Sequence, residues 1–303
     1  MVKFSSKVAK YAKKPLSDKL LDLFIYLSML VVLVCTLFVF MYVISCSVSD
    51  PEAVIRKDIY FFPKGFSLNA YTHLFRYGDI LKYYRNSIFY TVTGCIMSTV
   101  FTICGAYVLS SPAFSCRRII MLFITFTMYF SGGLVPTFLL VSKLGIYNTV
   151  WALLLPGLIS PFNLIVARTF FHNLPQSLFE SARLDGASEF RILLRIAIPL
   201  SGAIIAVLGL YYAVAQWNSY FSAMIYLPNK DLQPLQVYLV NILITESSTA
   251  NKSVASSLTR ANSLTSIQLK YCAIVVTILP IICVYPFVQK YFVKGVMIGA
   301  LKD

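Results

Sequence analysis

The stretch His172-Asn-Leu-Pro-Gln-Ser-Leu-Phe-Glu-Ser-Ala-Arg-Leu-Asp-Gly-Ala-Ser-Glu-Phe-Arg-Ile-Leu-Leu-Arg-Ile-Ala-Ile-Pro-Leu200 separates two long apolar runs of the chain. A simple connector between two helices needs only a few residues, so this one has structure of its own. Pro175 suits the first turn of a helix. Leu174, Leu178 and Ala182 recur at i, i+4 and i+8, which predicts a short amphipathic helix.

A sharp turn and a second helix are predicted to follow. Gly186, directly after Asp185, can adopt the left-handed conformation that ends a helix. Ser188 can then cap the next helix. The apolar face of that second helix consists of Phe190, Leu193, Leu194 and Ala197.

Two kinds of partner could hold such a hairpin. Arg183, Arg191 and Arg195 would allow it to rest on an anionic lipid surface. Glu180 and Asp185, which precede the turn, fit lipid less well and a basic protein socket better. The pattern therefore favours a protein partner over lipid.

Outward from the hairpin, the chain consists largely of apolar runs. Of the 303 residues, 58% are apolar and 13% are charged, whereas a soluble domain carries about 25% charged residues. A spanning helix needs about 20 mostly apolar residues. Six such helices are predicted, which makes the fold class an all-α membrane protein; they cover residues 20–46, 86–110, 119–141, 149–171, 198–221 and 271–292.

Basic residues set the expected orientation. With the N-terminus inside, the inner segments hold 15 of the 26 Lys and Arg residues and the outer segments hold 11. We expect residues 1–19 to be a cytoplasmic tail and residues 20–303 to be the membrane domain, with both termini cytoplasmic. Its core is expected at about 83–292, and its inner loop at about 172–198.

Composition excludes several classes of function. The net charge of +14 comes mainly from residues beside apolar runs, so membrane lipid is expected as a partner and nucleic acid is not. His73 and His172 stand alone, and no cysteines have Cys-x-x-Cys spacing, which argues against a metal site. The sequence has no catalytic constellation and no Gly-x-x-x-x-Gly-Lys-Ser/Thr loop, so we expect no enzyme activity, no bound ATP and no cofactor in this chain.

The hairpin also carries a specific resemblance. Glu180-Ser-Ala-Arg-Leu-Asp-Gly186, followed by Ile196-Ala-Ile-Pro199, resembles the coupling loop of ABC importer permeases in their sugar-transporting branch. That loop reads Glu-Ala-Ala, any three residues, Gly, and later Ile-x-Leu-Pro. Ser181 replaces the middle Ala and Ile198 replaces the Leu, and both changes are small.

Other stretches are similar to the complex-oligosaccharide permeases of Gram-positive bacteria, which resemble the smaller permease subunit of maltose-type importers. These stretches are Phe62-Pro-Lys-Gly-Phe-Ser-Leu-Asn-Ala-Tyr71, Phe130-Ser-Gly-Gly-Leu-Val-Pro-Thr137, Trp217-Asn218 and Tyr285-Pro-Phe-Val-Gln-Lys-Tyr-Phe-Val-Lys-Gly-Val-Met-Ile-Gly299. The resemblance implies a type I ABC importer permease fold with a cytoplasmic coupling helix, in a bacterial plasma membrane.

The same resemblance implies partners and roles. The partners would be a second permease subunit, two cytosolic ATP-binding subunits and an extracellular solute-binding lipoprotein that delivers an oligosaccharide. Glu180, Ala182, Asp185 and Gly186 would couple the chain to the ATPase. Two alternatives stay open: a secondary transporter driven by ions, although no charged group lies convincingly inside a span, or an importer permease for a solute other than sugar.

Aromatic and amide side chains inside the fifth span are candidates for the substrate pathway. Tyr212, Gln216 and Tyr220 are spaced to share one helix face, with Trp217 and Asn218 beside them. Sugars stack on aromatic rings and accept hydrogen bonds from amides, but plain helix packing at the outer interface would use the same residues.

Two further features allow more than one interpretation. Gly132-Gly133 and Pro136 in the third span suit either a flexing gate or close helix packing. The Ser- and Thr-rich outer segment 245–266 resembles, by its position, the loop that such permeases insert into their binding protein, but it could equally be a plain outer loop.

Overall fold

The computed structural model describes residues 16–77, 79–249 and 267–286. Within these ranges every regular element is a helix, and two residues, Ser49 and Phe66, form an isolated bridge. The predicted all-α architecture is confirmed. Most of the predicted tail 1–19, the part of the outer segment 245–266 that starts at residue 250, and the end of the sixth span lie outside the described residues.

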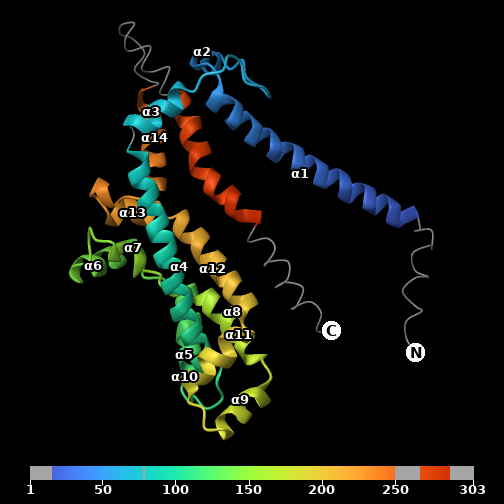
Figure 1. Ribbon diagram of the computed structural model, residues 1–303, viewed down its shortest axis with the longest axis vertical. Helices are drawn as coiled ribbons and strands as arrows, with labels where there is room; N and C mark the ends of the chain where they lie inside the picture. Colours follow the sequence, from blue (N-terminus) through green and yellow to red (C-terminus); the bar gives the residue numbers. More distant parts are fainter. Residues whose placement is uncertain (1–15, 78, 250–266, 287–303) are drawn as a thin grey trace. The chain divides into compact units, whose positions relative to one another are not determined.

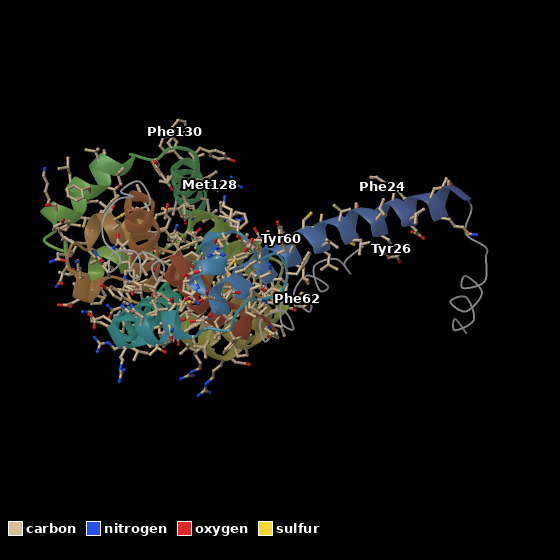
Figure 2. All side chains as sticks on the ribbon, turned by 90° about the horizontal axis from the view of Figure 1, so that it is seen from above. Phe24, Tyr26, Tyr60, Phe62, Met128 and Phe130 are labelled. Atoms are coloured by element: carbon tan, nitrogen blue, oxygen red, sulfur yellow. The ribbon has the colours of Figure 1, made fainter. Side chains whose placement is uncertain are left out.

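The chain divides into two compact units, and the first contains the N-terminal helix. Helix α1 (Leu16–Val48) is the predicted first span, and its side chains are almost all exposed. Phe24 and Tyr26 project from it in Figure 2. An apolar helix exposed on every side is what a lipid-facing anchor requires, because hydrocarbon then covers its side chains. Helix α2 (Pro51–Ile55) follows it.

Hydrogen bonds hold the first unit together at the end of α1. Gln268, at the start of the helix Ile267–Pro286, is fully buried. Its Nε2 donates to the carbonyl oxygens of Ser47 at 3.1 Å, Ser49 at 2.7 Å and Ser67 at 3.2 Å. One amide therefore joins three backbone positions that are distant in sequence.

The second unit is a helical bundle around one long helix, α4 (Ile80–Ser110). Figure 1 shows α8 (Pro161–His172) and α12 (Gly202–Trp217) running beside α4, and both pack against it. The boundary between the units falls within α3 (Asn69–Tyr77). The remaining elements of the second unit are α5 (Arg117–Tyr129), α6 (Leu134–Lys143), α7 (Trp151–Leu154), α9 (Gln176–Leu184), α10 (Glu189–Ile192), η2 (Leu193–Ala197), α11 (Ile198–Leu200), α13 (Phe221–Tyr226), η3 (Lys230–Leu232) and α14 (Leu235–Thr249).

The described residues agree roughly with the predicted six spanning helices, and the structure adds breaks within some of them. Three described helices are long and apolar enough to cross a membrane, and the number rises to five if each of two bent pairs counts as one span. The predicted third span is split into α5 and α6 with a bend of 117° between them. The predicted fifth span is bent by 83° near Ser201, and its helix ends at Trp217 instead of Phe221.

The predicted fourth span, 149–171, is interrupted between α7 and α8. Pro156 and Pro161 cannot donate backbone hydrogen bonds, and Gly157 adopts a φ of +81°. A continuous helix tolerates neither feature well. Hydropathy shows the length of an apolar run but not these local breaks.

The two ends of α4 separate the predicted inner and outer connections. At one end, Ser111 and Pro112 line the same small pocket as Phe179 of α9. At the other end, Lys82 contacts Asp231 in the outer connection. Two segments predicted to be inner thus meet at one end of α4, and a segment predicted to be outer lies at its other end.

Candidate functional site

The hairpin formed by α9 and α10 has the predicted helix, glycine turn and second helix. Gly186 adopts a φ of +77°. The amide of Gly186 donates to the carbonyl of Arg183 at 3.0 Å, and the amide of Ala187 donates to the carbonyl of Ala182 at 3.0 Å. These two bonds are the Schellman arrangement that ends a helix at a left-handed glycine. Ser188 caps α10, since its hydroxyl accepts from the amide of Arg191 at 3.4 Å.

The inner face of the hairpin belongs to the core of the bundle. Phe179 and Ala182 of α9 are buried, as are Ile192, Leu193 and Ala197 after the turn. They lie in the same hydrophobic cluster as residues of α4, α8 and α12. The ring of Phe179 lies 6.4 Å from that of Tyr107 on α4. The hairpin is therefore packed onto the membrane helices and is not a free arm.

A charged contact reinforces this packing. Arg183 Nε donates to Glu189 Oε1 at 2.7 Å, and Tyr107 Oη donates to Glu189 Oε2 at 2.7 Å. The hydrogen bonds from Arg183, and then from Tyr107, lower the pKa of the Glu189 carboxyl. Glu189 in turn raises the pKa of Arg183. One carboxylate thus connects α9, α10 and α4.

The outer face of the hairpin is exposed and carries large apolar side chains. Leu184 is 89% exposed and Phe190 is 68% exposed, on either side of the glycine turn. Glu180 and Asp185 are exposed on the same hairpin. Apolar side chains grouped on an exposed surface mark an interaction site more often than chance, because water contact with them is unfavourable.

The four residues predicted to couple the chain to a partner differ in their exposure. Glu180, Asp185 and Gly186 are exposed and available for contact. Ala182 is buried in the hydrophobic cluster, so it packs against the chain's own helices. Its small side chain lets α9 lie close to them.

Sequence reasoning missed the contact of Arg183, Glu189 and Tyr107. Arg183 and Glu189 lie on opposite sides of a predicted turn, which was a usable signal for an ion pair across the hairpin. Tyr107 lies 82 residues from Glu189, so no local pattern could have found it.

Tyr212, the first predicted pathway residue, is a structural link between helices. It is buried, and its Oη lies 2.7 Å from Thr102 Oγ1 of α4. The same oxygen accepts a hydrogen bond from the amide of Ser160, which caps α8, at 3.1 Å. These bonds use the hydroxyl group inside the bundle and leave it little capacity for a sugar.

The other predicted pathway residues do not form one open surface. Trp217 is buried beside Tyr84, with ring centroids 6.3 Å apart. The side chain of Gln216 is partly exposed and fills the space above Gly94. Asn218 is exposed, and its Nδ2 donates to the carbonyl of Val214 at 2.9 Å. Because α12 ends at Trp217, the helix face that was to include Tyr220 does not exist.

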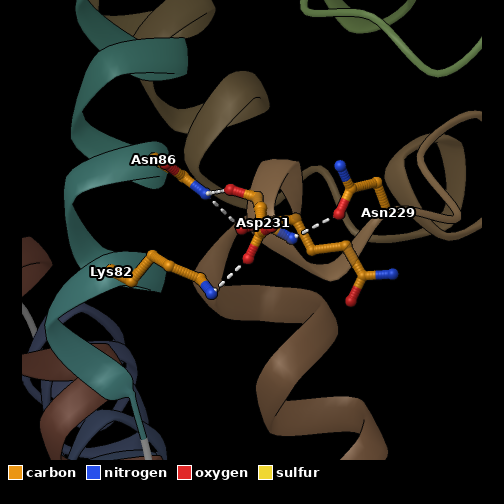
Figure 3. Close-up of polar contacts among 5 residues, drawn as sticks. Lys82, Asn86, Asn229 and Asp231 are labelled. Carbon is orange, nitrogen blue, oxygen red and sulfur yellow. Dashed lines mark hydrogen bonds and ion pairs between the residues drawn. The ribbon is translucent and has the colours of Figure 1, made fainter.

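A second polar cluster, also missed in the sequence, holds the outer connection to α4 (Figure 3). Lys82 Nζ lies 2.5 Å from Asp231 Oδ1, and this contact lowers the pKa of Asp231. Asn86 Nδ2 donates to the carbonyls of Asp231 at 2.7 Å and Gln233 at 3.0 Å. Asn229 accepts from the amide of Asp231 at 2.9 Å. This outer cluster fixes the turn between α13 and α14.

Metal ligands are also absent from the described part of the chain: no group of three or more His, Cys, Asp or Glu side chains there could hold an ion.

Glu189→Gln is expected to loosen the hairpin, because it removes the ion pair with Arg183. Backbone amides of α9 and α10 should exchange with deuterated water several-fold faster at neutral pH, since local opening becomes easier. The lowered pKa of Glu189 means that the wild-type advantage is present above the ordinary value of 4.5 and is lost as the pH falls through the lowered pKa. Glu180→Gln, which removes an exposed carboxylate from the same hairpin, is the control. Equal exchange in Glu189→Gln and wild type at pH 7 would contradict the assignment.

Tyr212→Phe should destabilise the bundle without changing recognition of any substrate. The change leaves the amide of Ser160 and the hydroxyl of Thr102 without their buried partner, at a cost of about 1–3 kcal/mol. Thermal melting of the purified protein measures the loss. Tyr211→Phe, at the exposed neighbouring position, should melt like the wild type. A Tyr212→Phe protein that melts normally but loses substrate affinity would restore the pathway role.

Comparison with known proteins agrees with this architecture. Residues 7–298 match the family described as "binding-protein-dependent transport system inner membrane component". A solved structure, a bacterial ABC transporter involved in the import of the acidic polysaccharide alginate, contains a chain that is 32% identical. That likeness has a TM-score of 0.84 and covers 93% of this chain and 99% of the other.

Two curated relatives come from Bacillus subtilis (strain 168). Protein LplC is 40% identical over 88% of this chain and 90% of its own length. The polygalacturonan/rhamnogalacturonan transport system permease protein YtcP is 38% identical over 95% of this chain and 100% of its own length. The expected resemblance to ABC importer permeases is confirmed, and so is the expectation of a transport component instead of an enzyme. The chain belongs to the family of inner membrane components of binding-protein-dependent transport systems, and is a multi-pass permease of an ABC importer.

Proposed function

We propose that the hairpin 176–197 docks into a cytosolic ATPase subunit and transmits its movement to the membrane helices. One observation carries this proposal: the hairpin's inner face is buried in the same cluster as α4, α8 and α12, while its outer face exposes Leu184 and Phe190. A surface built in this way can receive a partner on one side and move helices on the other. Glu180 and Asp185 would contact basic residues of the ATPase, and Gly186 would keep the turn tight.

The remaining subunits follow from the family, whose members work with other permease, ATP-binding and substrate-binding components. We place a second permease beside this chain, two ATPase copies below it and a solute-binding lipoprotein outside. In this arrangement the hairpin and both termini are cytoplasmic, and the outer cluster at Lys82 and Asp231 faces the binding protein. The outer segment 245–266 begins in the last residues of α14, whose connection to α13 the outer cluster holds in place.

The proposed cargo is an oligosaccharide. Supporting relatives are the polygalacturonan/rhamnogalacturonan permease YtcP and the arabinooligosaccharides transport system permease AraQ, 27% identical over 79% of this chain. Membership of a binding-protein-dependent family removes the ion-driven transporter as an alternative. Of the predicted pathway residues, only Gln216 and Asn218 have accessible amides, so only these two are proposed to reach the sugar.

Gly186→Val is expected to uncouple transport. Its φ of +77° disfavours any residue with a side chain, although no atom lies within 4 Å of the position that a Cβ would occupy. The strain amounts to about 1–2 kcal/mol and would shift Leu184 and Phe190 on either side. ATP-driven uptake by the reconstituted importer should fall sharply, whereas Gly186→Asn should retain much of it, because Asn tolerates this conformation. Normal uptake with Gly186→Val would count against the coupling role.

The cargo is tested with the assembled importer and its binding protein in membrane vesicles. Uptake of radiolabelled oligogalacturonides and arabino-oligosaccharides should require ATP and the binding protein, and a short peptide should not enter. Vesicles that import the peptide but neither sugar would refute the oligosaccharide cargo and leave the ATPase-coupling proposal standing.

A further inference from the structure

The elbow between α5 and α6, residues 129–133, has backbone groups without hydrogen-bond partners among the described residues. Helix α5 ends at Tyr129 and α6 begins at Leu134, and their axes differ by 117°. Gly133 has a φ of +86° and a ψ of −179°, which suits glycine. A Cβ there would have no atom within 4 Å, so close helix packing does not explain this glycine. The structure shows a bend at this glycine pair, whereas the predicted flexing of a gate stays a prediction.

The length of α5 would place the elbow at the depth of the bilayer interior. Helix α5 starts at Arg117, at the same end of α4 as the hairpin, and its 13 residues rise about 20 Å. The hydrocarbon core of a bilayer is about 30 Å thick. From residue 119 to residue 142 the sequence has no charged side chain. The bend therefore occurs inside an apolar segment and not at the membrane surface.

Backbone groups at the elbow lack partners. The amide of Gly133 donates to Ser131 Oγ at 3.3 Å, and its carbonyl accepts from Thr137. The amides of Ser131 and Gly132, and the carbonyl of Phe130, have no hydrogen-bond partner among the described residues. Exposed non-helical backbone is not tolerated against lipid tails, and persists at this depth only inside protein or along a water-filled cavity.

The side chains around these groups are aromatic and exposed. Tyr129 is 76% exposed and Phe130 is 65% exposed. The ring of Phe130 stacks on that of Phe126, with centroids 4.5 Å apart and planes 17° apart. Figure 2 shows Met128 and Phe130 at the rim of their unit, pointing away from it. Free amides next to a flat apolar ring match the mixed surface of a sugar, which has hydroxyl groups on its edge and C–H groups on its faces.

We propose that the elbow 129–133 lines the translocation pathway and is a contact site for the oligosaccharide, with Phe130 stacking on a sugar face and the backbone at Ser131 and Gly132 bonding its hydroxyls. This site rests on the proposed function for the identity of its cargo. A pathway enclosed by two permeases must be lined by surfaces that are exposed on each separate chain, as this one is. Broken spanning helices serve in the same way in other transporters, because their unwound backbone is free to bind.

Water access to the elbow is tested first, in the assembled importer in membrane vesicles. Ser131→Cys is treated with a membrane-impermeant thiol reagent, and Leu122→Cys on regular α5 is the control. Both positions lie between Arg118 and Lys143, on one tryptic peptide that contains no native cysteine, so mass spectrometry reads each without background. Ser131→Cys should react at least about tenfold faster, and saturating oligogalacturonides should slow it. Equal rates, or a fast rate that the sugar leaves unchanged, would overturn the site.

Transport kinetics test the ring. Phe130→Ala should raise the KM for oligogalacturonide uptake about tenfold through loss of one stacked contact, whereas Phe130→Tyr should keep it near the wild-type value. An unchanged KM in Phe130→Ala would overturn the stacking. Uptake by the wild-type importer in the same vesicles separates the oligosaccharide cargo from the sugar contact at the elbow. If the wild type imports the sugar but the sugar does not slow the reaction of Ser131→Cys, only the contact at the elbow is overturned. If the wild type imports no sugar, the oligosaccharide cargo and the sugar contact are both refuted. The rates at which Ser131→Cys and Leu122→Cys react with the thiol reagent then show whether the elbow lines the pathway.

Discussion

One continuous hydrophobic core reaches from the hairpin into the membrane helices, and the rest of the second unit depends on it. Phe179 and Ile192 of the hairpin are buried in the same cluster as Leu164 of α8 and Leu208 of α12. Close-packed cores have low compressibility and transmit displacement. The contact of Glu189 with Arg183 and Tyr107 adds a directional constraint to this packing, because it fixes the hairpin on α4. In the proposed coupling, a push on the hairpin would reach α4 and α12 through this packing.

The two ends of the bundle have different kinds of surface, and this difference suits a transport component that works between two aqueous compartments. The hairpin end exposes Leu184 and Phe190 beside acidic groups, which fits a protein partner. The outer end is held by the polar contacts of Lys82 and Asn86 with the turn at Asp231. Between the two ends, the predicted third, fourth and fifth spans are broken, at the elbow of α5 and α6, at Gly157 and near Ser201. At the elbow 129–133 the break leaves backbone amides without partners among the described residues, which a regular helix would satisfy.

Most of the fold was predictable from local patterns. The apolar runs predicted α1 and α4, and the glycine after Asp185 predicted the hairpin turn with its left-handed conformation, because these features depend on neighbours in sequence. Glycine and proline in the sequence signalled the breaks at Gly133 and Gly157. Hydropathy over a long apolar run does not reveal such breaks, because single residues change its mean very little. Contacts between distant residues could not be predicted. Tyr107 reaches Glu189 across 82 residues, and Tyr212 uses its hydroxyl within the bundle, which no spacing rule reveals.

The most direct test of rigid coupling is a distance measured across the second unit while the importer turns over. Spin labels on Leu184→Cys, at the hairpin, and on Leu81→Cys, at the outer end of α4, are both at exposed positions. Pulsed electron resonance would compare the nucleotide-free state with the ATP-bound state. If the hairpin and α4 move as one body, the distance should change by less than about 2 Å although the importer changes its access. A larger change on ATP binding would show that the hairpin swings independently of the spans, and would contradict the account.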